Sequence, residues 1–295
     1  MRIDVVWSIV KMSLCGAVFM AVCGTGHAGS IFLTGHDPDF HASLGGNLTG
    51  ARDLNIAAIN FVMDSGFNPF VSTAPKFLFV ESSISPPSGH TNGVNGIIAS
   101  GYVSGTNFDF ADASTLNAAL NNLGAASGYS AIVVASDFGG VLTQAELNIL
   151  NARSADIISF LNAGGGLYAM AESAAPYGLT STGEFGFLPF IVSSAALNQT
   201  EVGNTLTSFG TSLGLLTSDI NGNASHNIFT STGGMNVVDY DAAGDILSLA
   251  VRAQVTPVGV VPEPESALLL LSGLAALAFG RRRPRRPPNY QEHAG

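Results

Sequence analysis

The chain of 295 residues carries a net charge of −10, and charged residues make up 11% of it. Its body, from Gly29 to Val260, holds seventeen Asp and Glu residues but few basic ones, which are Arg52, Lys76, Arg153 and Arg252. Such an acidic body repels nucleic acid and anionic membrane surfaces, so a nucleic-acid partner is excluded from the expected functions.

The N-terminus has the pattern of a secretory signal. An apolar run extends from Met12 to Cys23, and the small residues that signal peptidase requires end at Ala28. We therefore expect residues 1–28 to be a signal peptide that signal peptidase removes. Lipid attachment at Cys23 is the alternative, but Val22 is large for the position before a lipobox cysteine.

Both cysteines of the chain, Cys15 and Cys23, lie inside this signal. The exported protein would contain no thiol, which excludes disulfides, thiolate nucleophiles and cysteine metal sites. About 230 residues remain for the body, enough for one domain with a substantial hydrophobic core. We expect residues 29–256 to form that domain.

The first half of the body alternates between strand-like and helical segments. Ser30 to Thr34 is a short apolar run typical of a strand, and Gly50 to Asp64 places its apolar residues at helical spacing. Lys76 to Val80 is the next predicted strand. A loop rich in turn-forming residues follows from Ser82 to Gly96, and a weaker helical pattern covers Ser114 to Leu123.

The clearest strand, Ala131 to Ala135, precedes a long predicted helix. Thr143 and Glu146 have the spacing of a capping box, which predicts one helix from Gln144 to about Asn162. Three glycines end that helix before the strand Leu167 to Ala171. A strand, a helix and a second strand in this order predict that the two strands are parallel.

Continuous apolar strands that alternate with helices indicate a parallel sheet covered on both faces. With right-handed connections, the predicted fold class is α/β, with a doubly wound, mostly parallel, open sheet. Near the end of the body, Asn236 to Tyr240 and Ile246 to Val251 flank a turn, and we expect them to form a C-terminal β-hairpin.

Several motifs of the body are shared with a known superfamily. They are Phe32-Leu33-Thr34-Gly35-His36-Asp37, Ile132-Val133-Val134, Leu142-Thr143, Phe160-Leu161-Asn162 and Gly164-Gly165-Gly166-Leu167. In this order the body, above all the stretch from Tyr129 to Glu172, resembles the class I glutamine amidotransferase superfamily. The resemblance implies a flavodoxin-like fold.

The same resemblance argues against the superfamily's reaction. Active members place a cysteine on the turn after the strand that corresponds to Leu167 to Ala171, and here the turn begins Glu172-Ser173. Without the thiol, glutamine hydrolysis by that mechanism is not available. Ser173 is a weak candidate nucleophile, because alanines stand where a serine elbow has glycines. A capping serine is the plainer interpretation.

Ligands of an open parallel sheet bind beyond the carboxyl ends of its strands. The residues that follow the predicted strands are His36, Asp37, Glu81, Asp137 and Glu172. We expect these five residues to converge on one binding rim. Clustered carboxylates repel one another, so the rim needs a divalent cation or raised pKa values. The alternative is that the two Asp residues cap turns while the two Glu residues lie in solvent.

The loop after the first strand adds candidate metal ligands. Asp37, Asp39 and His41 lie within five positions of one another. Oxygen ligands would suit calcium, whereas binding through the imidazoles of His36 and His41 would suit zinc. The spacing favours neither metal.

The C-terminus combines three features in a fixed order, which are Pro262-Glu263-Pro264, an apolar run from Ala267 to Phe279, and Arg281-Arg282-Arg283. The prolines resist helix continuation, the apolar run can enter a bilayer, and the arginines stay on its cytoplasmic side. Together they resemble the PEP-CTERM sorting signal of Gram-negative bacteria. The resemblance implies processing by an exosortase-type membrane protease.

We expect residues 257–295 to be this signal, with a short transmembrane helix. The apolar run falls short of the roughly 20 residues that a stable spanning helix prefers, which favours a transient anchor that is later removed. The protein would then pass through the inner membrane to the cell surface or the extracellular matrix.

Three functional classes fit these features. The favoured class is a noncatalytic exported protein whose body binds a small ligand, a carbohydrate or a protein. The second is a hydrolase or metal-dependent enzyme that uses the rim. The third is a structural component of the exopolysaccharide matrix. A polysaccharide is therefore a candidate partner in two of the three.

Overall fold

The computed structural model describes residues 28–253, except positions 87, 138, 173–184, 189–191 and 201. The chain divides into residues 1–256 and residues 257–295, and the described residues all belong to the first of these units. The predicted signal peptide before residue 28 and the predicted sorting signal lie outside them. No helix among the described residues is long and apolar enough to cross a membrane. The predicted transmembrane run from Ala267 to Phe279 is not among those residues.

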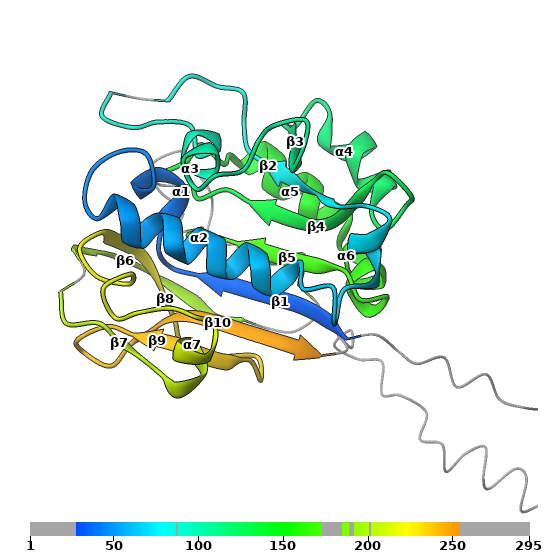
Figure 1. Ribbon diagram of the computed structural model, residues 1–295. Helices are drawn as coiled ribbons and strands as arrows, with labels where there is room; N and C mark the ends of the chain where they lie inside the picture. The colour runs from blue at the N-terminus through cyan, green and yellow to red at the C-terminus, as the bar shows by residue number, and fades with distance from the viewer. Residues whose placement is uncertain are drawn as a thin grey trace, which may run out of the picture. The chain divides into compact units, whose positions relative to one another are not determined.

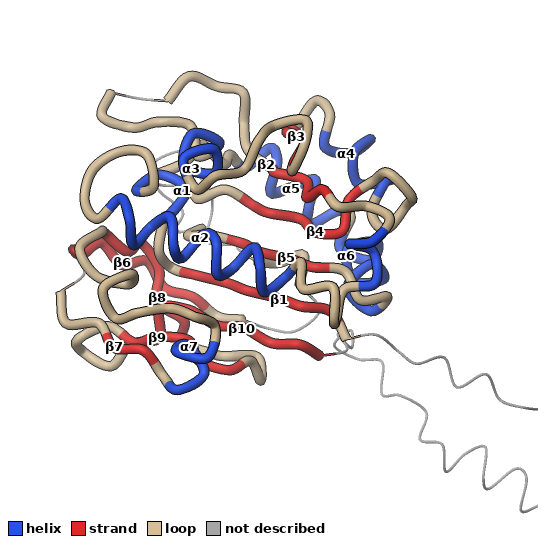
Figure 2. Tube along the Cα trace, in the orientation of Figure 1, coloured by secondary structure: helices blue, strands red, loops and turns tan. Residues whose placement is uncertain are grey.

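One mixed sheet, ten-stranded over the described residues, forms the centre of the first unit (Figure 1 and Figure 2). Its main path runs β3-β2-β4-β5-β1-β10-β8-β6, with β9 beside β10 and β7 beside β9. Neighbours from β3 to β1 are parallel, and the remaining pairs are antiparallel. The strands are β1 (Gly29–Thr34), β2 (Lys76–Val80), β3 (Phe108–Ala111), β4 (Tyr129–Val134), β5 (Gly166–Ala169), β6 (Ser194–Thr200), β7 (Thr205–Leu206), β8 (Ala224–Phe229), β9 (Asn236–Tyr240) and β10 (Ile246–Ala253).

Helices cover both faces of the parallel half of this sheet (Figure 1). The α-helices are α1 (Pro38–His41), α2 (Leu48–Val62), α3 (Val94–Ala99), α4 (Leu116–Ala119), α5 (Gln144–Ala152), α6 (Ser154–Asn162) and α7 (Ser208–Ser212). Two short 3-10 helices, η1 (Pro69–Ser72) and η2 (Leu120–Asn122), complete the described helical segments. The longest, α2, packs against β1 and β5, whereas α6 packs against β1 from the other side.

Glycines at the strand starts let these helices approach closely. A Cβ at Gly166 would lie 2.3 Å from the carbonyl oxygen of Val62 in α2, and one at Gly29 would lie 2.6 Å from that of Leu161 in α6. Gly166 pairs with Ser30, so Gly29 points to the opposite face of the sheet. The two helices therefore need glycine at these two positions, one on each face.

The core fills the space between the sheet and the helices. Every residue of β1 is buried, and Phe32 contacts the ring of Phe61 in α2 and that of Tyr168 in β5, with centroids 6.3 and 5.6 Å apart. Both contacts are edge-to-face, the arrangement that aromatic rings prefer. Strands buried on both faces explain why the parallel half reads as continuous apolar runs in the sequence.

Several predicted elements are confirmed. The α/β class and the open sheet are present, and β1, β2 and β4 occupy the predicted strands. The C-terminal hairpin is β9 and β10, which pair antiparallel. The capping box is also present, since the backbone N–H of Thr143 donates to Glu146 at 3.1 Å. The narrower flavodoxin-like assignment stays a prediction.

The single helix predicted from Gln144 to Asn162 is wrong. The chain breaks at Arg153, whose φ of −100° and ψ of 17° depart from helical values, and α5 and α6 lie on either side of it. The Arg153 guanidinium donates to the Asn117 carbonyl oxygen and to Asn121 Oδ1, both at 2.9 Å. Tertiary hydrogen bonds thus end a helix that the local sequence would continue.

Other elements differ from the prediction or were not predicted. The last parallel strand covers Gly166–Ala169 instead of Leu167 to Ala171, and α3 begins at Val94, inside the predicted loop. The sequence interpretation also lacked β3, β6, β7, β8 and α7. Most of these form the antiparallel extension of the sheet beyond β1.

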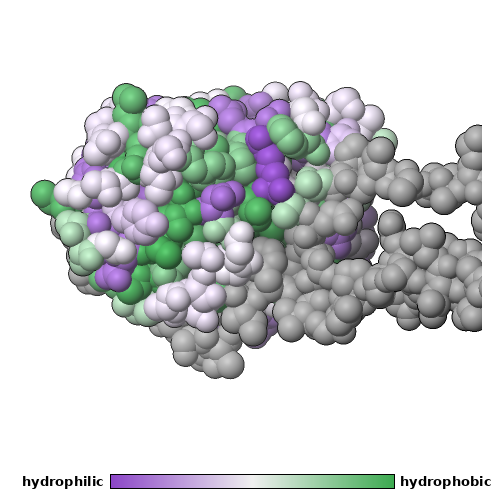
Figure 3. Space-filling view, turned by 90° about the horizontal axis from the view of Figure 1, so that it is seen from below, coloured by the Kyte–Doolittle hydropathy of each residue, from purple (hydrophilic) through white to green (hydrophobic). Residues whose placement is uncertain are grey.

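The surface carries apolar side chains that are interspersed with polar ones. Figure 3 shows this mixture on the face seen from below. Val202, Leu216 and Val103 are 76, 64 and 56% exposed, and they come from separate segments. Scattered exposed apolar residues are normal for a folded protein, so they do not indicate a docking surface.

Candidate functional site

The loops that follow β1, β2, β4 and β5 lie at one edge of the sheet (Figure 1). Hydrogen bonds tie them together: the Asp137 N–H donates to the Ala171 carbonyl at 2.9 Å, and the Ala171 N–H donates to that of His36 at 3.3 Å. A third bond, from Ser82 N–H to the Val141 carbonyl at 3.0 Å, joins the loops after β2 and β4. The structure thus places the five rim residues at the carboxyl edge of the parallel strands.

All five of these side chains are withdrawn from solvent. Asp37 is 1% exposed and His36 is 3% exposed, whereas Glu81, Asp137 and Glu172 are fully buried. The alternative in which the two glutamates lie in solvent is therefore wrong. Buried carboxylates must be paired or hydrogen-bonded, so the partners of each one decide what it can do.

Glu81 joins two loops through their backbone amides. Its Oε1 accepts hydrogen bonds from the N–H groups of Gly93 and Val141, the latter at 3.2 Å, and its Oε2 accepts one from Val94 at 3.2 Å. Burial and the nearby Asp39 raise the pKa of Glu81 to about 8, although the three amides oppose that rise. The side chain acts as a brace between the loops after β2 and β4.

Asp39 is bound to the loop after β4. Its Oδ1 accepts from the Ser136 hydroxyl at 2.7 Å, and its Oδ2 accepts from the Ser136 N–H at 2.9 Å. Burial is the main cause that raises the pKa of Asp39 to about 6, and its bonds to Ser136 lower it. Asp39 therefore hydrogen-bonds to Ser136 and lies near Glu81, and it belongs to a different hydrogen-bond network from that of Asp37.

Asp37 lies between two imidazoles. Its Oδ1 is 3.3 Å from Nε2 of His41, and its Oδ2 is 3.3 Å from Nε2 of His226. Neither carboxylate oxygen accepts a hydrogen bond from the described residues, and Nε2 of His41 instead accepts one from the Ala224 N–H at 3.2 Å, so the pairing is loose. A Cβ at Gly139 would lie 2.1 Å from Oδ2, so the loop after β4 covers this group closely.

His36 belongs to a second polar chain. Its Nε2 lies 2.8 Å from Oδ2 of Asp239, and its Nδ1 lies 2.9 Å from the hydroxyl of Ser225. Serine, histidine and aspartate in contact are the members of a hydrolytic triad, but Ser225 and Asp239 are fully buried. These buried side chains cross-link the loop after β1 to β8 and β9.

Glu172 binds the segment that follows it. Its Oε2 accepts from the Phe185 N–H at 3.0 Å, and its carbonyl oxygen accepts from the Asn227 side chain at 3.1 Å. Ser173, the weak nucleophile candidate, lies outside the described residues. Asp137 is fixed through its backbone bond to Ala171 and is fully buried.

The rim does not bring together the expected metal ligands in one cluster. Over the part of the chain that the structure describes, no group of three or more His, Cys, Asp or Glu side chains is placed to hold a metal ion. Asp37 and His41 are close, but Asp39 binds Ser136 instead. Binding of a divalent cation by Asp37, Asp39 and His41 stays a prediction.

Sequence reasoning missed the partners that the antiparallel strands supply. Ser225 and His226 come from β8, and Asp239 comes from β9, yet all three contact the loop after β1. The strand β8 was not predicted, because it mixes polar and apolar residues without a clean alternation, and the prediction of β9 gave no sign that Asp239 contacts His36. The spacing in the sequence between Asp37 and His226 contains no signal of contact.

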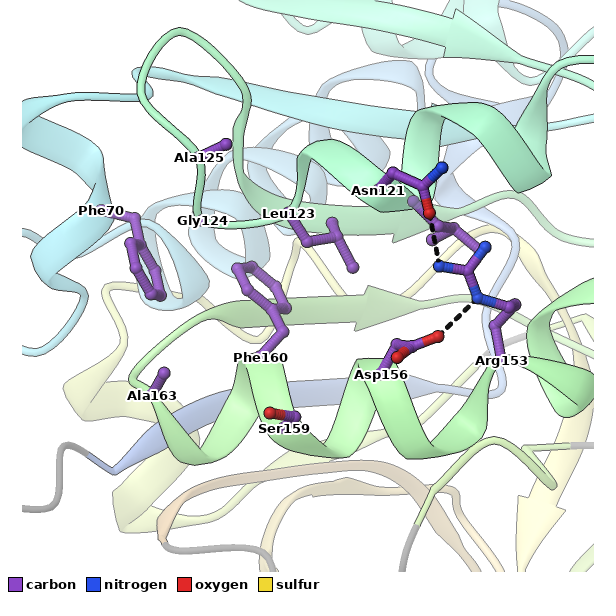
Figure 4. Close-up of a pocket in the computed structure, with 11 residues that line it drawn as sticks. Phe70, Asn121, Leu123, Gly124, Ala125, Arg153, Asp156, Ser159, Phe160 and Ala163 are labelled. Atoms are coloured by element: carbon purple, nitrogen blue, oxygen red, sulfur yellow. Dashed lines mark hydrogen bonds and ion pairs between the residues drawn. The ribbon is translucent and has the colours of Figure 1, made fainter.

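A pocket of about 510 Å³ lies away from the rim. Its lining comes from η1, the segment before β4, and the break between α5 and α6 with α6 itself (Figure 4). Phe70, Gly124 and Ala163 each precede the start of a parallel strand, which places the pocket at the amino ends of β2, β4 and β5. It therefore lies at the opposite end of the strands from Asp37 and Glu81.

The chain matches the family model described as the PEP-CTERM protein-sorting motif, over residues 260–286. The match covers the three features of the C-terminus and none of the α/β body. It supports export with a membrane-associated sorting step and implies processing by an exosortase. Comparisons with curated proteins and with solved structures gave no match.

Proposed function

We propose that this chain is an exported protein of a Gram-negative bacterium, sorted by an exosortase to the cell surface or the extracellular matrix. Its α/β body, residues 29–256, binds a ligand without catalysing a reaction. The sorting motif at residues 260–286 supports the first part. Removal of residues 1–28 by signal peptidase and of the C-terminal helix by the exosortase would release the body.

The bonding of two buried carboxylates, Glu81 and Asp39, is the observation that supports a noncatalytic body. Glu81 accepts from three backbone amides, and Asp39 accepts from Ser136 and from the Phe40 N–H at 3.0 Å. A general acid or base must reach the proton that it transfers, and these oxygens are already occupied. They fix the loops after β2 and β4 in place, which is what a preformed binding surface requires.

We place the ligand site of this proposal at the rim, over the trio of Asp37, His41 and His226. The His41 side chain is 12% exposed, the most of the three, and would meet the ligand first. The fixed loops of Glu81 and Asp137 would form the walls, in keeping with ligand binding at the carboxyl ends of parallel strands. Glu172 would bind the adjoining segment.

One observation favours the second candidate, a hydrolase or metal-dependent enzyme. Asp37 lies between two imidazoles, and one oxygen with two nitrogens is a set that zinc accepts, once Nε2 of His41 gives up the hydrogen bond that it accepts from the Ala224 N–H at 3.2 Å and the groups rearrange toward the metal. The N–O separations of 3.3 Å correspond to a loose pairing that a cation could replace. Ser173 would be the nucleophile of a metal-free alternative.

Metal analysis of the purified protein separates the two candidates. The protein is dialysed against zinc or calcium and its bound metal is measured, together with that of Asp37→Ala, Asp137→Ala and Glu172→Ala. A noncatalytic binder binds no stoichiometric metal. One bound metal per chain that is lost in Asp37→Ala, but kept in the control Asp109→Ala, would instead establish the metal-dependent candidate.

A structural matrix component is the third candidate, and it differs in its solution behaviour. Such a protein should self-associate or adhere to polysaccharide without saturation. Sedimentation velocity over a concentration series tests this directly. A single monomeric species at every concentration, with saturable ligand binding, supports the proposed binder, whereas growing assemblies would overturn it.

A further inference from the structure

The pocket at the amino ends of β2, β4 and β5 is lined by residues of a different kind from those of the rim. It is about 510 Å³ in volume, within the roughly 300–1,000 Å³ typical of small-molecule sites. Figure 4 shows its side chains in two groups, with aromatic and aliphatic residues at one end and polar residues at the other. The two groups of side chains determine which ligand would fit.

The apolar end is built on two phenylalanines. Phe70 from η1 and Phe160 from α6 stack with ring centroids 5.6 Å apart and an interplanar angle of 21°. Phe160 is 6% exposed and fixed in the core, whereas Phe70 is half-buried and Leu123 lies beside them. Because Phe160 is nearly fully buried, the half-buried Phe70 and Leu123 are the side chains that offer an apolar surface to one face of a ligand, with Phe160 supporting Phe70 from beneath.

The polar end is held in place before any ligand arrives. Arg153 donates from Nη1 to the carbonyl and side-chain oxygens of Asn117 at 2.9 and 2.7 Å. It also donates from Nε to Asp156 at 2.5 Å and from Nη2 to Asn121 at 2.9 Å (Figure 4). The second Nη2 hydrogen has no acceptor among the described residues. Because the guanidinium is fixed, a ligand that accepts from it loses little conformational entropy.

The charges at this end cancel. Arg153 and Asp156 form an ion pair, and they are the charged residues that line the pocket over the described part of the chain. The acidic body further disfavours anions, and Asp156 is already paired with Arg153, so the pocket lacks an uncompensated carboxylate for a cation. The matching ligand is neutral, with hydrogen-bonding groups on one edge and an apolar face.

We propose that this pocket binds a neutral sugar in its pyranose form. A pyranose ring presents C–H groups on one face and hydroxyls around its edge, which suits an aromatic platform next to Arg153, Asp156 and Asn121. The carboxylate accepts from a hydroxyl, while the guanidinium and the amide donate to one. The pocket lies at the other end of the strands from the rim, so a failure of the sugar proposal would leave the rim proposal intact.

Titration of the purified protein with single sugars tests the proposal. Glucose, galactose, mannose and N-acetylglucosamine are compared by isothermal calorimetry or ligand-observed NMR. We expect at least one to bind saturably in the millimolar range. Asn121→Ala should weaken that binding at least about threefold, since it removes one hydrogen-bonding group. Asn122→Ala is the matched control, because Asn122 is an exposed neighbour outside the lining.

Two further variants test the two ends of the pocket. Asp156→Asn leaves the Arg153 charge unopposed, so glucuronate should bind more tightly than glucose, reversing the order in the unchanged protein. Phe70→Leu should weaken every neutral sugar by a similar factor, because it removes the ring face. The proposal is overturned if no sugar binds saturably, or if Asn121→Ala and Phe70→Leu both bind like the unchanged protein.

Discussion

Glu81, which directly follows β2, accepts a hydrogen bond at 3.2 Å from the backbone N–H of Val141 in the loop after β4. The same carboxylate accepts from the N–H groups of Gly93 and Val94, at the start of α3. One buried side chain therefore joins three segments that meet at the carboxyl edge of the sheet.

Replacement of Glu81 should destabilise the protein, and the loss should be larger when the new side chain keeps fewer acceptor oxygens. Glu81→Ala leaves three backbone N–H groups without their acceptor, and each buried unsatisfied group costs about 1–3 kcal/mol, so we expect a loss of at least about 3 kcal/mol. Glu81→Gln keeps one acceptor oxygen and should cost less. Urea unfolding followed by circular dichroism measures both.

A surface carboxylate provides the matched control for these variants. Asp109 pairs with Lys76 at 3.1 Å, and its side chain is 38% exposed. Exposed pairs contribute at most about 1 kcal/mol, so Asp109→Asn should change the unfolding midpoint little. If Glu81→Ala were no more destabilising than Asp109→Asn, the role of Glu81 as a brace would be refuted.

The stability of the protein should increase as the pH falls from 8 to 5. The folded-state pKa of Glu81 is raised from 4.5 to about 8, and that of Asp39 is raised from 3.8 to about 6. Between the unfolded and folded values, the folded state holds more protons than the unfolded one, so the free energy of unfolding decreases as the pH rises. The contribution is complete below the unfolded pKa values and is lost as the pH passes the folded ones.

Urea midpoints at pH 5, 6, 7 and 8 measure this dependence. Glu81→Gln should flatten the upper part of the curve, since it removes the group that titrates there, and Asp39→Asn should flatten the lower part. A midpoint that rises steadily from pH 5 to pH 8 in the unchanged protein would contradict both raised pKa values.

The parallel half of the fold was predictable because local and tertiary signals agree there. β1, β2 and β4 are continuous apolar runs, and the capping box of Thr143 and Glu146 marks the start of α5. Once these strands are parallel, the residues that follow them meet at one edge whatever their identity. This geometric rule brought His36, Asp37 and Glu81 together in the sequence interpretation.

The burial and the contact partners of the rim residues were not predictable in the same way. Whether Glu81 is solvated or buried depends on the backbone amides of Gly93, Val94 and Val141, which no sequence motif marks. The contact of Asp37 with His226 depends on β8, which lies beside β10 in the antiparallel half. Strands of mixed polarity carry little periodicity, so the second half of the sheet contributed partners that spacing alone could not identify.

Arg252 should stabilise the end of β10 through its planar guanidinium. Its Cζ lies 4.3 Å from the ring centroid of Phe61 and 3.8 Å from that of Phe67, and its Nη2 lies 2.8 Å from Asp64. Cation–π contacts and a partly exposed ion pair together predict a loss of about 1–2 kcal/mol for Arg252→Ala.

Substitutions at Arg252 separate the contribution of its charge from that of its planar shape. Arg252→Lys keeps the charge but loses the planar group, so its midpoint in urea should fall between those of Arg252→Ala and the unchanged protein. Lys76→Ala removes an ion pair of similar exposure, so it is the control and should have a smaller effect than Arg252→Ala, which also removes the ring contacts. Equal midpoints for Arg252→Lys and the unchanged protein would refute the contribution of the planar stack.

Processing at the C-terminus should depend on the Pro-Glu-Pro triplet and not on the charge beside it. The sorting motif spans residues 260–286, so Glu263→Ala should block recognition, whereas Glu265→Ala removes an equivalent carboxylate outside the triplet and should be processed normally.

Intact mass spectrometry of the protein recovered from outside the cell measures the outcome. The unchanged protein and Glu265→Ala should lack Arg281 to Arg283, because these arginines hold the far end of the apolar run on the cytoplasmic side until cleavage. An exported, unchanged protein that still carries all three arginines would show that the motif does not direct cleavage in this chain.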